Sequence, residues 1–331
     1  MIKINIKKLV KFFGFKAVRL IILLIVVAAI SFIIVQLSPI DPVRAYLGQR
    51  IVSQEQLAIV GEYWGTNLTL GERVLGWLQT LASGSMGFSL IYRVPVTEVI
   101  VQKFTASFTL MIVSWIISGI VGFGLGVLAG AKEGTWIDKA IKTYCYILQS
   151  SPTFWIGLVI LMVFSVYLGW FPIGLSVPIG QLSDTVTFWQ WLYRLILPAF
   201  TLSIVGIASL TMYTRDKLIN VKKSDYFLFS KARGESFWGM IKNHGIRNIL
   251  LPAISIQFLS FNELFGGTIL VEQVFAYPGI GQATVAAGLR SDVPLLLGIV
   301  IVSTIFVFVG NMLADIMYEY VDPRIRSEDD E

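Results

Sequence analysis

The sequence predicts an all-α polytopic membrane protein with six transmembrane helices. Hydrophobic residues make up 55% of the 331-residue chain and charged residues only 14%, whereas a soluble domain carries about 25% charge. Six apolar runs each approach the roughly 20 residues that a helix needs to cross a bilayer. These runs are too long and too uniform to be the alternating strands of a membrane barrel. Together the three observations exclude a water-soluble or disordered chain.

The first predicted span, residues 20–37, follows a tail at residues 1–19 that carries six lysines and arginines. This arrangement also resembles a secretory signal peptide. The apolar run is longer than the apolar region of such a peptide, and no A-x-A cleavage site follows it. We therefore expect an uncleaved membrane anchor.

The other five spans are predicted at residues 104–131, 143–168, 195–214, 249–271 and 293–314. The second span contains no charged residue, the third is interrupted by Pro152, and the fifth contains Glu263. Two long segments connect the spans, an external loop at residues 38–103 and a cytoplasmic loop at residues 215–247. The prediction is a single membrane domain, residues 20–331, without an attached soluble domain.

Basic residues indicate which side each segment faces, because cytoplasmic segments near spans are enriched in lysine and arginine. The N-terminal tail holds six, the 132–142 turn three, the 215–247 loop eight and the C-terminal tail two, so 19 of the 26 lie on one side. We therefore expect both termini in the cytoplasm. Such residues bind lipid headgroups, so the basic net charge does not require a nucleic-acid partner.

Single occurrences of two residue types exclude several chemistries. Cys145 is the only cysteine and His244 the only histidine, so neither a His/Cys zinc cage nor an H-E-x-x-H hydrolase motif can form. The sequence also has no G-x-S-x-G motif for a membrane protease and no G-x-x-x-x-G-K-[ST] phosphate-binding loop. We expect no metal site, no catalytic residue and no ATPase site in this chain.

The cytoplasmic loop carries more aromatic residues than a connection between two spans needs. Its 33 positions include five of them, Tyr226, Phe227, Phe229, Phe237 and Trp238, and a plain connection in a compact domain is much shorter. Aromatic residues among charges are typical of a protein-docking surface. A helix lying on the lipid headgroups has a similar composition, and the pattern alone leaves both interpretations open.

Two stretches of this loop resemble a known family. They read Asp225-Tyr-Phe-Leu-Phe-Ser-Lys-Ala-Arg-Gly234 and His244-Gly-Ile-Arg-Asn-Ile-Leu-Leu-Pro252. They are similar to the signature loop of binding-protein-dependent ABC importer permeases, in the dipeptide/oligopeptide/nickel branch, which typically reads D-Y-V-R-T-A-R-A-K-G and then R-H-A-L-R-N-A-L-L-P. The chain departs from this pattern at Leu228 and Phe229, which replace a polar pair. It departs also at Ser230 and Lys231, which stand for Ala-Arg, and at Arg233, which replaces lysine.

Shorter motifs extend the resemblance over nearly the whole chain, in the family's order. Residues 38–42 look like the family's P-G-D-P with Ile40 in place of glycine, and residues 85–89 look like its D-L-G-x-S. The remaining matches are residues 151–155 at the third span, 267–281 around the outer end of the fifth span, 311–315, and 322–326 at the C-terminus.

The resemblance implies the fold of a type I ABC importer permease in the cell (inner, cytoplasmic) membrane. Such a chain forms half of a translocation pathway, here for peptides, nickel or a metal chelate. Its implied partners are a second homologous permease subunit, two ABC ATPase subunits that bind ATP and Mg²⁺, and an external or periplasmic substrate-binding protein. The chain itself would hold no cofactor. A stand-alone channel or secondary transporter is the alternative function, and it would need no ATPase-facing loop.

Residues of this loop are the expected sites of coupling to the ATPases. Phe237 and Trp238 would fill a groove on the ATPase, while Gly234 would permit a tight turn. Lys231, Arg233 and Arg247 would supply charge at the rim of this contact. The full expected set is Asp225, Tyr226, Lys231, Ala232, Arg233, Gly234, Phe237, Trp238, His244, Arg247 and Asn248.

Polar residues in the fifth and sixth spans are the expected lining of the translocation pathway. An ionised carboxylate at the centre of a span costs about 2.5–3.5 kcal/mol, so Glu263 must face protein or water. It either lines the pathway, favouring a cationic or hydrogen-bonding cargo, or forms a polar pair between helices. Residues four apart near the inner end of the sixth span either line the inner mouth or solvate the helix end. The expected set is Gln257, Asn262, Glu263, Asn311 and Asp315.

Glycines mark two further features. Tyr277, Pro278, Gly279 and Gly281 follow the fifth span and form an outer gate, a contact for the binding protein, or a plain connection. In the second span, glycines at positions 122, 126 and 130 repeat every four residues. This spacing is typical of helices that pack closely in membranes.

Overall fold

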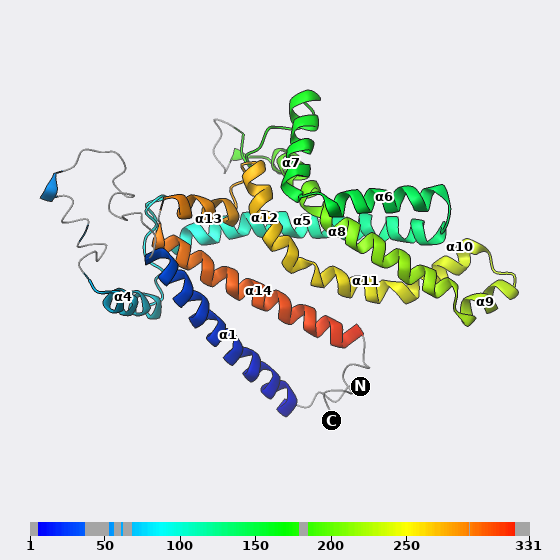
Figure 1. Ribbon diagram of the computed structural model, residues 1–331, viewed down its shortest axis with the longest axis horizontal. Helices are drawn as coiled ribbons and strands as arrows, with labels where there is room; N and C mark the ends of the chain where they lie inside the picture. The colour runs from blue at the N-terminus through cyan, green and yellow to red at the C-terminus, as the bar shows by residue number, and fades with distance from the viewer. Residues whose placement is uncertain are drawn as a thin grey trace. The chain divides into compact units, whose positions relative to one another are not determined.

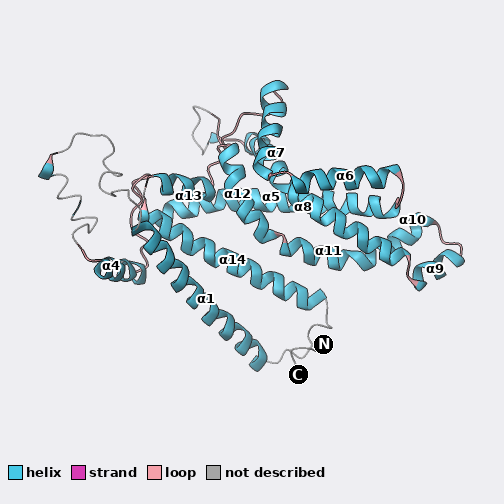
Figure 2. Cartoon of the chain, in the orientation of Figure 1, coloured by secondary structure: helices cyan, strands magenta, loops and turns pink. Residues whose placement is uncertain are grey.

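The computed structural model of the protein describes residues 6–36, 53–55, 61, 68–178, 185–290 and 292–321. These residues form helices, and the only β-pairing among them is an isolated bridge between Phe88 and Pro95 (Figure 2). The motifs at residues 38–42 and 322–326 lie outside the described residues, as do residues 43–52, 56–60 and 62–67 of the predicted external loop. The chain divides into two compact units, residues 1–105 with 282–309 and residues 106–281 with 310–331.

Four helices of the described part of the chain are long and apolar enough to cross a membrane. They are α1 (Ile6–Gln36), α5 (Val96–Ala131), α8 (Phe188–Lys222) and α14 (Val293–Val321). Two bent pairs bring the number to as many as six if each pair is one span. The structure thus confirms an all-helical membrane protein with four to six spans.

The predicted third span is not one helix. It consists of α6 (Trp136–Ser150), α7 (Thr153–Leu161) and the π-helical η1 (Met162–Tyr167), with a bend of 106° at the break (Figure 1). Pro152 causes the break, because a proline disfavours helical backbone at the residue before it. Ser151 accordingly has extended backbone, with φ −101° and ψ 136°.

The two predicted connecting segments are partly helical. Helix α5 begins at Val96, within the predicted external loop, and α8 continues to Lys222, within the predicted 215–247 loop. The charged end of α8 is stabilised by ion pairs with α6 and the turn that precedes it. Arg215 pairs with the buried Asp138 at 2.5 Å, and Lys222 pairs with Glu133 at 3.0 Å.

In the first unit, a buried carboxylate ties the 85–95 turn to the start of α14. Asp292 is fully buried, and its Oδ2 accepts hydrogen bonds from the Ser89 hydroxyl at 2.6 Å and the Ile91 amide at 3.1 Å. Its Oδ1 caps α14 by accepting the Leu295 amide at 3.2 Å. The unit also contains α4 (Leu70–Ala82), whose Thr69 and Glu72 form a capping box.

In the second unit, α8 contacts α6, α7, α11 (Arg247–Leu259) and α12 (Phe261–Val274). The glycines at 122, 126 and 130 of α5 lie directly against α8. A β-carbon on Gly126 would lie 2.5 Å from Cβ of Thr214 and 2.7 Å from the carbonyl oxygen of Thr211. The prediction that this repeat serves close helix packing is confirmed.

Candidate coupling surface and translocation cavity

The segment after α8 is helical rather than an open loop. It comprises α9 (Asp225–Ala232), α10 (Phe237–Met240) and the π-helical η3 (Ile241–Ile246), which runs directly into α11. Gly234 ends α9 with φ +79°, a conformation that a residue with a β-carbon rarely adopts. No atom outside its neighbours lies within 4 Å of a β-carbon built there, so Gly234 is required by backbone conformation rather than by space.

One side of this segment is anchored in an apolar core. Phe227 of α9 is 5% exposed, Met240 4% and Ile241 1%. These three pack in one cluster with Ala131, Leu218 and Ile249, which belong to α5, α8 and α11. Because burial of such side chains fixes the helices that carry them, the segment is held against α5, α8 and α11.

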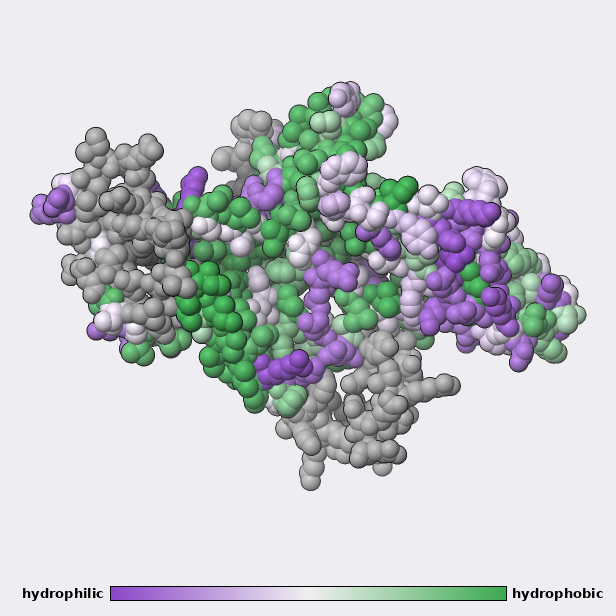
Figure 3. All heavy atoms as spheres, viewed as in Figure 1, coloured by the Kyte–Doolittle hydropathy of each residue, from purple (hydrophilic) through white to green (hydrophobic). Residues whose placement is uncertain are grey.

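The opposite side of the segment is an exposed apolar surface. Phe229 is 64% exposed and Trp238 54%, and the guanidinium of Arg233 lies 5.9 Å from the Phe229 ring centre. Figure 3 shows hydrophobic and hydrophilic residues side by side on this end of the chain, where α9 and α10 lie. The α9–α10 surface, as we call it, consists of Tyr226, Leu228, Phe229, Phe237 and Trp238.

His244 braces the segment from within. Its Nε2 lies 3.1 Å from the Ser230 hydroxyl of α9 and 3.2 Å from a carboxylate oxygen of Glu235. Because one nitrogen faces both groups, the arrangement is not the relay of a serine hydrolase, in which each ring nitrogen has its own partner. The side-chain amide of Asn248 donates a hydrogen bond to the His244 carbonyl, four residues earlier, at 2.6 Å.

The remaining predicted coupling residues lie on the outside of the same segment. All five are exposed and three of them are basic: Asp225, Lys231, Ala232, Arg233 and Arg247.

Three of the predicted pathway residues pair with neighbouring helices. Gln257 is 5% exposed, and its Nε2 donates to the Trp115 carbonyl at 2.7 Å and to the Ser118 hydroxyl at 2.8 Å. Asn262 of α12 donates to the side-chain oxygen of Asn311 on α14. These side chains join α11 to α5 and α12 to α14, and Asp315 is exposed further along α14.

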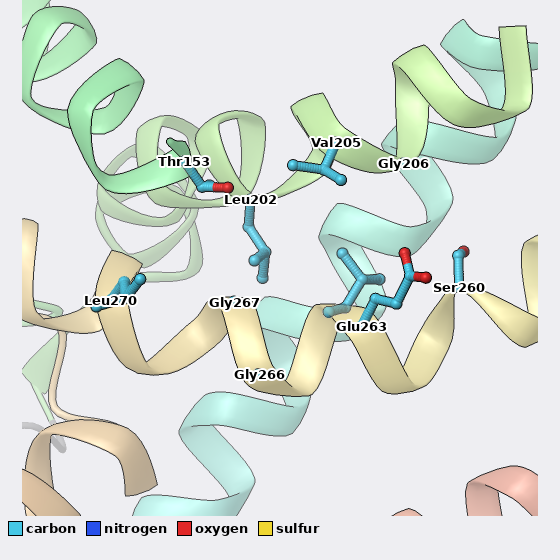
Figure 4. A pocket seen from close by; sticks show the side chains of 10 residues that line it. Thr153, Leu202, Val205, Gly206, Ser260, Glu263, Gly266, Gly267 and Leu270 are labelled. Atoms are coloured by element: carbon cyan, nitrogen blue, oxygen red, sulfur yellow. The ribbon is translucent and has the colours of Figure 1, made fainter. Parts of the chain in front are cut away.

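The second unit contains a cavity of about 300 Å³, lined by residues of α7, α8 and α12. Of the five predicted pathway residues, only Glu263 lines it. Figure 4 shows the Glu263 carboxylate pointing from α12 toward α8, with Ser260 beside it. The lining comes from α7, α8, α12 and the break before α12: Thr153, Leu202, Val205, Gly206, Ser260, Glu263, Leu264, Gly266, Gly267 and Leu270.

The turn after α12 is buried around the carboxylate of Glu272, for which the sequence predicted no role. Glu272 is fully buried, and its Oε1 accepts a hydrogen bond from the Ser107 hydroxyl at 2.5 Å. That hydroxyl in turn accepts the amide of Ile280 at 2.7 Å, where α13 (Ile280–Leu289) begins. A β-carbon on Gly279 would lie 2.1 Å from the same carboxylate oxygen. In the sequence, the signal for this packing is an acidic residue, Glu272, followed by two closely spaced glycines, Gly279 and Gly281.

Burial limits what the predicted gate residues can contact. Tyr277 is 2% exposed, and Gly279 and Gly281 are buried as well, whereas Pro278 is partly exposed. Burial, and then the charge of Glu272, raises the pKa of Tyr277 to about 12. A direct contact with a binding protein would therefore fall to Pro278, and the other three residues fit a structural part of a gate better.

Comparison with known proteins places this geometry in context. Residues 122–327 match the family model described as "Binding-protein-dependent transport system inner membrane component". The chain is 34% identical over 304 residues to the oligopeptide transport system permease protein AppB of Bacillus subtilis (strain 168), covering 92% of this chain and 95% of that protein. It is 31% identical over 318 residues to the di/tripeptide transport system permease protein DppB of Pseudomonas aeruginosa (strain UCBPP-PA14), covering 91% and 94%. It is 30% identical over 303 residues to the glutathione transport system permease protein GsiC of Salmonella choleraesuis (strain SC-B67), covering 92% and 94%.

Proposed function

The chain belongs to the family of binding-protein-dependent transport system inner membrane components, and on that premise we propose that it forms half of the translocation pathway of an ATP-driven peptide importer. As a member of this family it is a permease subunit of the inner membrane without an ATPase domain. The proposed complex contains a second permease subunit, two ATPase subunits and a substrate-binding protein. Both termini and the α9–α10 surface face the cytoplasm in this arrangement.

Peptides are the cargo that the relatives favour. The three relatives described above are named for oligopeptides, for di- and tripeptides, and for glutathione. None of these names supports nickel. Among the residues that the structure describes, no group of three or more His, Cys, Asp or Glu side chains is arranged to hold a metal ion. A metal chelate therefore has no support from this chain.

The α9–α10 surface is the observation that carries coupling to separate ATPases. Exposed aromatic side chains on a segment whose other side is anchored in the core form a rigid patch that fits a groove on a partner. Contiguous exposed apolar surface of this kind marks an interaction site. A stand-alone channel or secondary transporter has no use for such a patch, and a helix resting on lipid headgroups would not need the bracing by His244.

The cavity beside Glu263 is our candidate for this subunit's part of the pathway. The second permease subunit would supply the facing half. Asn311 and Asp315, near the inner end of α14, would approach the cytoplasmic mouth, and the buried turn at residues 277–281 would form part of the outer gate.

Removing two aromatic rings from the α9–α10 surface tests the proposed coupling. We expect Phe229→Ala with Trp238→Ala to reduce co-purification of the ATPases and uptake of peptide at least tenfold, because both side chains are more than half exposed and neither belongs to the buried cluster that anchors the segment. Membrane insertion should be unchanged. Trp189→Ala is the matched control, since Trp189 is 75% exposed at the other end of α8. Normal ATPase binding by the double variant would reject this surface as the docking site.

A further inference from the structure

The cavity beside Glu263 has an unusual distribution of charge. Its lining contains one ionisable side chain, Glu263, and the hydroxyls of Thr153 and Ser260, while the other lining residues are aliphatic or glycine. The carboxylate is exposed to the cavity rather than packed against a neighbouring helix. The cavity is therefore a mostly apolar pocket with a single negative charge.

Among the described residues, no lysine or arginine lies within ion-pair distance of the Glu263 carboxylate. An uncompensated carboxylate within a span is costly. A cation that enters the cavity would offset part of this cost, whereas an anionic group would be repelled.

The available partners select an organic cation rather than a metal ion. Divalent metals need several ligating oxygens or nitrogens, and no metal-holding group is present among the described residues. An ammonium needs acceptors for up to three N–H groups. Ser260 lies one helical turn before Glu263, and because its hydroxyl hydrogen is donated to the Gln257 carbonyl at 2.8 Å, its oxygen remains free to accept.

We propose that the Glu263 cavity is an ammonium-binding subsite of the peptide pathway, with the Glu263 carboxylate and the Ser260 oxygen as acceptors. The inference rests on the proposed function, which supplies a cargo that carries such a group at its amino terminus or on a lysine side chain. The subsite orients the cargo during passage. Its single charge suits a conducting pathway, in which a site must bind well enough to admit the cargo and weakly enough to release it.

Thiol protection tests the subsite without relying on the binding protein. The complete permease–ATPase complex is prepared with Val205→Cys, which places a thiol on the cavity lining and leaves both proposed acceptors intact. Cys145 is replaced by serine, and the accessible cysteines of the partner subunits are replaced as well. The rate of modification by N-ethylmaleimide is then measured against three probes: trialanine, N-acetyl-trialanine, and N-acetyl-alanyl-lysyl-alanine. The first carries an amino-terminal ammonium, the second carries none, and the third carries only a side-chain ammonium.

We expect N-acetyl-trialanine to need at least a tenfold higher concentration for the same protection as trialanine. Protection by the lysine probe as well would show that any ammonium is accepted, and its absence would restrict the subsite to the amino terminus. Adding Glu263→Gln should remove the difference between the probes, whereas Glu98→Gln, which removes an exposed charge at the start of α5, should preserve it. Elution of each complex as a single symmetric peak in size-exclusion chromatography reports that each variant is folded and assembled.

Equal protection by trialanine and N-acetyl-trialanine, or no protection by any probe, would overturn the subsite. So would a difference between these two probes that persists in Glu263→Gln. Uptake of trialanine by the complete importer with its binding protein separates this failure from a failure of the proposed function. Uptake without protection rejects the subsite alone, and absence of peptide uptake by the unmodified importer rejects the peptide function.

Discussion

Gly279→Ala is expected to abolish transport and to lower the stability of the folded protein by several kcal/mol. The new β-carbon would lie 2.1 Å from Oε1 of Glu272 and 2.2 Å from its carboxyl carbon. Overpacking of this kind costs about 1–3 kcal/mol. Displacing the carboxylate from the Ser107 hydroxyl would add about 1–3 kcal/mol for a buried group left without its partner. Uptake and the thermal unfolding midpoint of the detergent-solubilised complex measure the effect.

Two further variants show whether Glu272 is the cause. Gly288→Ala is the control. Gly288 lies within α13, whereas Gly279 directly precedes this helix, and no atom lies within 4 Å of a β-carbon built on Gly288. Replacing Glu272 with alanine in the Gly279→Ala background removes the clashing atoms and should recover part of the lost stability. Equal stability of Gly279→Ala and Gly288→Ala would contradict the packing of this turn around Glu272.

Gly126→Val is expected to prevent assembly of a stable permease. The nearest neighbours of its β-carbon, at 2.5 and 2.7 Å, are Cβ of Thr214 and the backbone oxygen of Thr211, so α8 itself would have to move. Because α8 contacts α9 directly, as well as α6, α7, α11 and α12, the displacement would spread to the coupling surface. The yield of monodisperse complex and its unfolding midpoint are the measurements.

Gly124→Val is the matched control for this variant. Gly124 lies on the same helix, two residues away, and a β-carbon built there meets no atom within 4 Å. Both substitutions add the same β-branched side chain to the same helix, so the cost in helix propensity is nearly the same at the two positions. Similar behaviour of the two variants would show that α5 and α8 do not pack through Gly126.

The spans could be predicted where composition decides them. Residues 104–131 form part of α5 because an uncharged run of this length has no other stable form in a bilayer. The ends of the helices could not be predicted in the same way. Helix α8 continues past the apolar run through Arg215 and Lys222, and the ion pairs that stabilise this end involve residues about 80 to 90 positions away. Hydropathy contains no information about such partners.

Breaks within spans were only partly visible in the sequence. Pro152 marks the break between α6 and α7, but the 106° bend depends on what each helix packs against. The 46° bend between α11 and α12 falls at Ser260, eight residues after the nearest proline, Pro252. Neither the position nor the size of this second bend follows from a local residue preference.

The candidate site shows the same division between local and distant information. The sequence located the coupling segment because its aromatic residues and its glycine are contiguous. It could not separate Glu263 from Gln257, because a polar residue in a span either lines a cavity or pairs with another helix, and the partner of Gln257 is 142 residues away. Glu272 was missed for the same reason, since Ser107 is 165 residues away.

Photocrosslinking from position 229 in living cells tests the central claim most directly. A photoreactive phenylalanine analogue replaces Phe229, whose side chain is 64% exposed on the α9–α10 surface, and the crosslinked partner is identified by mass spectrometry. The account predicts an adduct with an ATPase subunit, which places this surface in the cytoplasm and in contact with the motor. An adduct with the external binding protein, or with lipid alone while uptake is normal, would contradict it.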